Sequence, residues 1–198
     1  MQILELEKFE LKGSILDVGS KKSPSNVSNH IKYNKDITYL DKYSNDPNDI
    51  KIDLEEKYIG NLDIKFDNIV LFNVLEHIYK FHNCINTCNS FLKKDGLFIG
   101  STPFIFQIHG SPNDYFRFTS ETLNIILKEA GFKNIETKVL LGGIFVCFYS
   151  SISRSTQKIP FLNNLLFLIC QFFDLILSIF SKNLRSIFPI GYFFKGKK

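Results

Sequence analysis

ILDVGSKKSP, residues Ile15–Pro24, is an apolar run that leads into an acid, one glycine and a polar turn. A short β-strand that ends in this way usually presents a backbone loop to a nucleotide-like ligand. The stretch also departs from that pattern, because Lys21 and Lys22 follow Gly19 and Ser20 where such a loop normally carries more glycine. It therefore predicts a cofactor loop and leaves open whether the loop still binds its ligand.

The composition of the 198-residue chain is typical of one folded domain. Hydrophobic residues make up 44% and aromatic residues 15%, which is enough for a core. The net charge is only +4, and no basic helix with interleaved aromatic residues occurs, so we expect no nucleic-acid partner. The charged N-terminus is unlike a secretion signal, which favours a cytoplasmic protein, either free or peripheral on the inner face of the membrane.

Two histidines and two cysteines, His77, His82, Cys84 and Cys88, raise the question of a zinc site. On one helix His77 and Cys84 would stand about 10 Å apart along the axis, too far for bonds of about 2 Å to one ion. The spacing of a buried helical stripe is instead followed by Ile78, Phe81, Ile85, Cys88 and Leu92. We therefore predict core cysteines and no metal site.

Apolar runs and helical patterns alternate along the chain. The expected strands are Ser14–Val18, Ile37–Leu40, Lys51–Leu54, Phe66–Phe72, Gly96–Ser101 and Ile135–Leu141. The expected helices are His77–Leu92 and a second one that is capped by Thr119 and Ser120 and ends at Gly131. This order predicts a doubly wound α/β sheet with its ligand at the carboxyl ends of the strands.

An acid follows the second expected strand. Asp41 lies 24 residues after Asp17, where a carboxylate can accept hydrogen bonds from both hydroxyls of a ribose. NAD-binding proteins use the same geometry, but their G-x-G-x-x-G fingerprint requires glycines that this loop lacks beyond Gly19. The residues therefore disfavour NAD.

Taken in order, these segments resemble the class I S-adenosylmethionine (SAM)-dependent methyltransferases, in particular the methyltransferase type 11 group. Across about residues 15–132, ILDVGS is similar to the first cofactor motif of that family, TYLD to the acidic second, IDLEE to the segment beside the adenine, and FDNIVLFNVLEHI to the fourth-strand motif. HGSPNDYFRFTSETLNIILKEAGF is similar to a segment of methyltransferases that accompany surface-polysaccharide biosynthesis. LEH and DYFRFT together are more specific than either alone.

The resemblance implies SAM as the cofactor and a role for each residue at the strand ends. The residues expected to bind SAM are Asp17, Gly19, Ser20, Asp41, Asp53, Leu54 and Asn73. Asp41 would take the ribose, Asp53 and Leu54 the adenine edge, and Asn73 would face the transfer point. His77 would lie close to the same point as a catalytic candidate. A purely structural role stays open for Asp41, Asn73 and His77.

The loop after the fifth strand is the expected acceptor site, because function concentrates in such loops. His109 is the candidate general base, since imidazole titrates near neutral pH, and Asp114 is a further catalytic candidate. Tyr115 and Arg117 would bind the acceptor, Arg117 by its fork of donors to a phosphate or carboxylate. The alternative is an ion pair between Asp114 and Arg117 that only fixes the loop.

Residues Phe161–Phe180 (FLNNLLFLICQFFDLILSIF) are too apolar for an ordinary surface helix. Polar residues recur on one narrow stripe of it, and an Asp near the middle of a spanning helix costs about 2.5–3.5 kcal/mol. Three alternatives stay open: a transmembrane helix, a helix in the membrane interface flanked by Lys158, Lys182 and Arg185, and a lid or homodimer helix. The final PIGYFF, Pro189–Phe194, resembles the last, antiparallel strand of the methyltransferase sheet, so residues 151–188 would form a helical insertion before it, over the acceptor side.

These observations predict a single domain over residues 1–198, with a seven-stranded, mostly parallel, Rossmann-like sheet. They predict a SAM-dependent methyltransferase that acts on a hydroxyl of a sugar or glycoconjugate precursor, and they leave open a peripheral membrane contact through residues 161–181. The alternative is a protein of the same fold that no longer binds SAM and serves as a membrane-associated partner or scaffold. Lys21 and Lys22 motivate that alternative.

Overall fold

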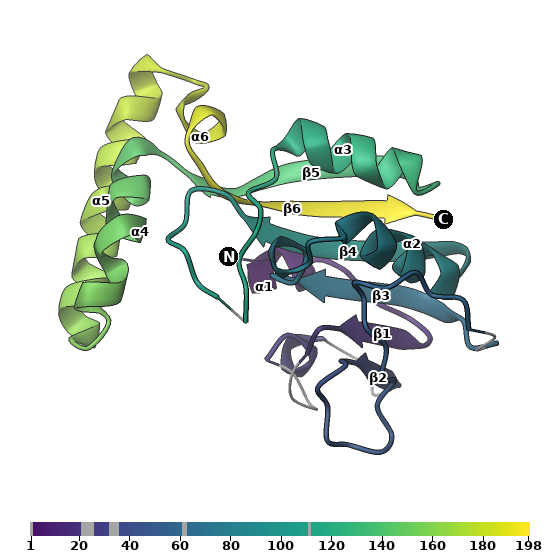
Figure 1. Cartoon of the computed structure of the whole chain (residues 1–198). Helices are drawn as coiled ribbons and strands as arrows, with labels where there is room; N and C mark the ends of the chain where they lie inside the picture. Colours follow the sequence, from purple (N-terminus) through teal and green to yellow (C-terminus); the bar gives the residue numbers. More distant parts are fainter. Residues whose placement is uncertain (1, 21–25, 32–35, 61–62, 111) are drawn as a thin grey trace.

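The computed structural model describes residues 2–20, 26–31, 36–60, 63–110 and 112–198, which form a six-stranded sheet in the order β2-β1-β3-β4-β6-β5 (Figure 1). The strands are β1 (Ile15–Val18), β2 (Ile37–Leu40), β3 (Phe66–Phe72), β4 (Leu92–Pro103), β5 (Lys133–Gly142) and β6 (Pro189–Lys197). β2, β1, β3 and β4 pair in parallel, and β6 is antiparallel to both of its neighbours. The antiparallel last strand is the one that the sequence predicted.

Helices cover both faces of the sheet, as a doubly wound fold requires. Successive residues of a strand point to opposite faces. Leu16 therefore packs in the core cluster with α2 (Phe81–Phe91) and α3 (Ser120–Glu129), whereas Ile15 packs in a second cluster with α1 (Gln2–Leu6) and the chain around the 3-10 turn η1 (Ser28–His30). Cys84 and Cys88 are buried in the first cluster, as predicted.

The predicted third strand, Lys51–Leu54, does not form, so the sheet has six strands and the prediction of seven is wrong. Only Ile50 bridges to β2, and the chain then turns, because the Asp53 carboxylate accepts from the N–H of Glu55 at 3.0 Å. Such a side-chain contact offers the backbone an alternative to a ladder of strand hydrogen bonds. The Glu55 carboxylate in turn accepts from the N–H groups of Tyr79 and Lys80, both at 2.8 Å, at the start of α2. The segment therefore caps a helix instead of extending the sheet.

The helix predicted over His77–Leu92 is shorter at both ends. LEH itself forms a 3-10 turn, η2 (Leu75–His77), and α2 begins only at Phe81. At the other end Leu92 already belongs to β4, which is longer than the predicted Gly96–Ser101 strand. The helix after Thr119 matches its prediction: the Thr119 hydroxyl accepts from the N–H of Thr122 at 3.2 Å, and Gly131 follows with a φ of 92°.

Three helices, α4 (Ile144–Thr156), α5 (Pro160–Phe180) and α6 (Leu184–Ile187), fill the chain between β5 and β6. The insertion thus begins at Ile144 and not at residue 151. Asp174 of α5 is 2% exposed and accepts from the N–H groups of Phe145 and Val146, at 3.0 and 2.8 Å, at the N-terminus of α4. A helix N-terminus favours an anion, so this contact explains an acid within so apolar a helix. The pair stands at the end of the sheet toward which β3 and β4 point (Figure 1).

Candidate active site

The carboxyl ends of β1, β2 and β3 meet at one edge of the sheet, because the three strands pair in parallel register. Gly19, Asp41 and Asn73 are the residues that follow these ends closely. In doubly wound sheets this edge is where ligands bind. The fold therefore gathers at one edge residues that the sequence predicted to bind the cofactor from three separate segments.

The chain is closely packed where β1 ends. Gly19 has a φ of 75°, and a Cβ there would stand 2.4 Å from Cγ2 of Val74, so only glycine is accommodated. The Ser20 hydroxyl is buried and has no hydrogen-bond partner within the described chain. Asp17 is 3% exposed in the strand just before. A buried hydroxyl without a protein partner suits the polar methionine part of SAM; Lys21 and Lys22 lie outside the described residues.

The remaining residues that were predicted to bind the cofactor differ in how many contacts their side chains make within the protein. Asp41 is buried and accepts from the N–H of Tyr43 at 2.8 Å. Asp53 pairs with Lys42 at 2.9 Å, and Leu54 packs in the core. Asn73 is exposed, has a φ of 53°, and accepts from the hydroxyl of Ser101 at 3.3 Å. Taken with the β1 end, the residues present fit an adenosyl cofactor.

The two motifs that were most specific in the sequence dock onto each other. The N–H groups of Tyr115 and Phe116 donate to the backbone carbonyl of Glu76, at 2.8 and 3.3 Å. The ring of Tyr115 also meets that of Tyr79 edge to face, with centroids 5.4 Å apart. LEH and DYFRFT, about 40 residues apart, therefore form one structural unit beside the carboxyl ends of β3 and β4.

Glu76, His77 and His109 converge within this unit. The Glu76 side chain is fully buried, and its Oε1 lies 3.6 Å from Nε2 of His77 and 3.8 Å from Nε2 of His109. Burial raises the pKa of Glu76 to about 7. The sequence interpretation assigned no role to Glu76, although LEH was recognised, because the glutamate's importance depends on a histidine far along the chain. His77 and His109 were both predicted, and they are brought together.

Asp114 and Arg117 form the ion pair that the sequence left as an alternative. The guanidinium holds both carboxylate oxygens, with Nη2 to Oδ2 at 2.7 Å, and it keeps the pKa of Asp114 well below its usual range. Asp114 also accepts from the N–H of His109 at 2.9 Å, and Arg117 donates to the carbonyl of Phe116 at 2.8 Å. The pair therefore fixes the loop that carries His109; acceptor binding by Arg117 stays a prediction.

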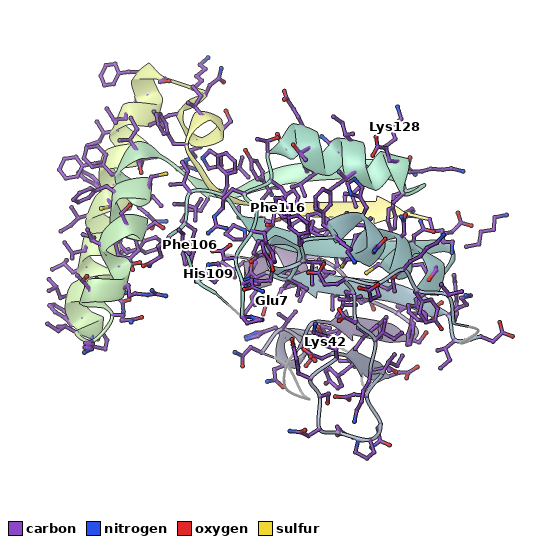
Figure 2. The ribbon with its side chains drawn as sticks, viewed as in Figure 1. Glu7, Lys42, Phe106, His109, Phe116 and Lys128 are labelled. Carbon is purple, nitrogen blue, oxygen red and sulfur yellow. The ribbon has the colours of Figure 1, made fainter. Side chains whose placement is uncertain are left out.

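A cavity of about 510 Å³ opens beside these residues, within the size range of small-molecule sites. It is lined by Phe104, Ile105, Phe106, Gln107, Ile108, Asp114, Tyr115, Phe116, Arg117 and Ser151. Ser151 belongs to α4, so the helical insertion forms part of the wall. Figure 2 labels Phe106, His109 and Phe116 between the helical pair and the sheet, and the rings of Phe106 and His109 meet with centroids 5.2 Å apart.

Comparison with solved structures shows how widely this architecture is shared. A SAM-dependent methyltransferase from Archaeoglobus fulgidus superposes with a TM-score of 0.61 at 14% identity, over 99% of this chain and 92% of that one. A SAM-dependent methyltransferase from Mesorhizobium loti gives 0.56 at 13% identity, over 100% and 98%. Phosphoethanolamine N-methyltransferase 2 from Haemonchus contortus, in complex with S-adenosyl-L-methionine, gives 0.57 at 16%, over 100% of this chain and 52% of that protein. At these identities the similarity shows the fold.

Comparison of the sequence with known families identifies the protein class. No curated protein matches the chain. The family described as "Methyltransferase domain" matches residues 2–137, which is more than half of the chain and includes the carboxyl ends of β1, β2 and β3 and the loop after β4. The chain therefore belongs to the methyltransferase domain family and is a SAM-dependent methyltransferase.

Proposed function

We propose that the enzyme methylates a hydroxyl group of a small-molecule acceptor, a sugar or a glycoconjugate precursor. The observation that carries this proposal is the convergence of Glu76, His77 and His109 close to a 510 Å³ cavity. An alcohol must lose its proton to attack, so proton-accepting side chains at the acceptor site favour an oxygen acceptor over a neutral amine. The sugar part rests on the resemblance of residues 109–132 to methyltransferases of surface-polysaccharide biosynthesis.

Each part of the chain has a defined task in this reaction. When bound, SAM supplies a methyl group on a positively charged sulfur, which leaves with the bonding electron pair as a neutral thioether. The Gly19 edge holds the cofactor, the cavity holds the acceptor, and the proton of the acceptor hydroxyl passes to the cluster of Glu76, His77 and His109. Alignment alone can supply about 7–11 kcal/mol, so the chain needs no covalent nucleophile.

A labelled-methyl assay tests the acceptor class. Purified enzyme is incubated with SAM carrying a tritiated methyl group and with free sugars, nucleotide sugars and lipid-linked sugars in separate reactions. Phosphoethanolamine serves as the matched amine acceptor. We expect label on a hydroxyl oxygen of at least one sugar class. Label only on the amine would contradict the proposal, and absence of any SAM binding by calorimetry would restore the scaffold alternative.

We further propose that α5 contacts a membrane surface. It is the one helix in the described chain that is long and apolar enough to span a membrane, and only 11% of its apolar window is buried. Phe161, Ile179 and Phe180 are 80%, 74% and 83% exposed. Exposed apolar patches mark interaction sites, and the flanking Lys158 and Lys182 suit anionic lipids. The buried contact of Asp174 with α4 supports a helix lying against the surface over one that spans it.

Vesicle flotation tests the membrane contact. We expect the protein to float with vesicles that contain phosphatidylserine and to float less with neutral vesicles. A Phe161→Ser/Phe180→Ser variant should lose this binding and keep its melting temperature, because both side chains are exposed. A protein that stays in the soluble fraction with both vesicle types would contradict the contact; a dimer in ultracentrifugation would then favour a homodimer face.

A further inference from the structure

Three potential ligand atoms face one another at the carboxyl ends of β3 and β4. One ligand atom from each of Glu76, His77 and His109 lies within 4.8 Å of the other two, in a search of the described residues. The distances of 3.6 and 3.8 Å from Oε1 of Glu76 to the two Nε2 atoms are too long for hydrogen bonds. Around a metal ion with bonds of about 2.1 Å, tetrahedral ligand atoms stand about 3.4 Å apart. Small side-chain movements would therefore complete a coordination shell.

The other ring nitrogen of each histidine is held by an acceptor. Nδ1 of His77 lies 2.5 Å from the carbonyl oxygen of Asn113. Nδ1 of His109 lies 3.2 Å from the carbonyl oxygen of Gln107 and 3.4 Å from Oδ2 of Asp114. Carbonyl and carboxylate oxygens only accept, so Nδ1 carries a proton in both rings, and in the neutral imidazole Nε2 is the nitrogen that can bind a metal. A histidine that binds a metal through one ring nitrogen usually donates from the other to a carbonyl or carboxylate oxygen.

Glu76 supplies an independent sign of a missing positive partner. Its side chain is fully buried, and among the described residues Oε1 has no hydrogen-bond partner. Thr102 donates to the other oxygen, at the long distance of 3.5 Å. A buried carboxylate is costly unless a charge or a donor compensates for it. This carboxylate oxygen lies between two imidazole nitrogens, where a cation would compensate for its burial.

We propose that Glu76, His77 and His109 bind a divalent first-row transition-metal cation such as Zn²⁺ or Fe²⁺. Imidazole suits these ions, whereas Mg²⁺ prefers oxygen ligands. The prediction of no metal site examined histidines and cysteines near one another in sequence, and His109 lies 32 residues after His77. Three protein ligands leave a position open. Resting here on the proposed function, that position would take the acceptor hydroxyl and lower its pKa. The bound cation then replaces direct proton transfer to the three side chains, and the hydroxyl proton leaves to water.

Cobalt titration tests the site directly. Tag-free full-length enzyme is treated with a chelator and titrated with Co²⁺, whose visible absorption reports coordination. We expect one Co²⁺ per chain, displaced by Zn²⁺ and not by Mg²⁺, and at least a tenfold loss of affinity in His77→Ala and in His109→Ala. The other two histidines of the chain provide matched controls: His30→Ala and His82→Ala should bind Co²⁺ as the wild type does. Melting temperatures verify that each variant folds, and His109→Ala decides the matter if His77→Ala does not fold.

The outcomes separate the metal site from the acceptor. No Co²⁺ binding at millimolar concentration, or equal binding by all four variants, would overturn the metal site. Cobalt binding that depends on His77 and His109, in an enzyme that methylates no hydroxyl, would support the metal site and refute the proposed acceptor class. Hydroxyl methylation at full rate in excess chelator would refute the proposal that the bound cation lowers the pKa of the acceptor hydroxyl.

Discussion

Gly19 links the cofactor edge to the LEH motif. Its backbone passes so close to Val74 that an added Cβ would stand 2.4 Å from a methyl group of that valine. Val74 precedes the η2 turn that carries Glu76 and His77. A larger residue at position 19 would therefore press on the segment that positions Glu76 and His77.

We expect Gly19→Ala to weaken SAM binding at least tenfold. The substitution places a side chain at a φ of 75°, which costs about 1–2 kcal/mol, and adds the clash with Val74. Gly131→Ala is the matched control, because its φ is 92° while the nearest atom to the new Cβ is 3.8 Å away. It should lose stability but keep SAM affinity, as measured by calorimetry and thermal melting. Equal loss of SAM affinity in both variants would contradict the role of Gly19.

Single residues could be assigned from the sequence when their partners lie close along the chain, and were missed when the partners lie far apart. The positions of Gly19 and Asp41 after the first two strands could be predicted, because the end of a parallel strand fixes where the next residue lies; their binding of SAM stays a prediction. The Asp114–Arg117 pair was foreseen as an alternative because its partners are three residues apart. Glu76 was missed, since its burial and its approach to His109 depend on the docking of two distant segments.

At the scale of the elements, Asp67 ties the start of β1 to β3 and β4. Its Oδ2 accepts from the N–H of Ser14 at 2.8 Å and from Lys93 at 2.8 Å. The hydrogen bond from Lys93, followed by those from Ser14, lowers the pKa of Asp67 below its ordinary value. The ion pair with Lys93 therefore stabilises the junction of the three strands only while the Asp67 carboxylate is ionised.

We expect Asp67→Asn to destabilise the protein by less than about 1 kcal/mol at pH 7, because the pair is partly exposed. The folded pKa lies below the unfolded value of about 3.9, so this contribution is present above pH 4 and is lost as the pH falls through the folded pKa. Urea unfolding at several pH values measures it. The difference from the wild type should shrink in acid, while exposed Asp63→Asn should show little effect. A difference that grows in acid would contradict the assignment.

Asp174 is the contact that holds the helical pair together. Replacing it with Ala leaves two N–H groups at the start of α4 without their acceptor, and we expect a loss of about 2–3 kcal/mol. Thermal melting should show a fall of several degrees, and Asn164→Ala, on an exposed position of the same helix, should change little. An Asp174→Ala protein that melts with the wild type would show that the helices pack independently of this contact.

The elements themselves were largely predictable, and the failures have local causes. Strongly apolar runs such as Phe66–Phe72 were identified to the residue, because a strand buried on both faces needs an unbroken apolar run. KIDL alternates like a strand, yet the Asp53 turn and the capping by Glu55 redirect it. The alternation of polar and apolar residues in KIDL gives no sign of either contact.

Across the whole molecule, the acceptor cavity is shared between the loop after β4 and the insertion. Ser151 is its contribution from α4. We expect Ser151→Phe to fill part of the cavity and to reduce methyl transfer about tenfold, without changing SAM affinity, because the Gly19 edge is not touched. Ser155→Phe, at an exposed position of the same helix outside the cavity lining, is the control. Equal transfer rates for both variants would show that the acceptor binds elsewhere.

The two strands that flank the insertion pair with each other where it begins and ends. Gly142 at the end of β5 lies opposite Pro189 at the start of β6, and the N–H of Gly143 donates to the carbonyl of Phe188 at 2.9 Å. The chain thus leaves the sheet and re-enters it at neighbouring points, like the two ends of a hairpin loop. Insertions and deletions between them need not shift the register of any strand. Sequence changes in the insertion can therefore alter the cavity wall and the exposed apolar helix together, while the carboxyl ends of β1, β2 and β3 keep their geometry.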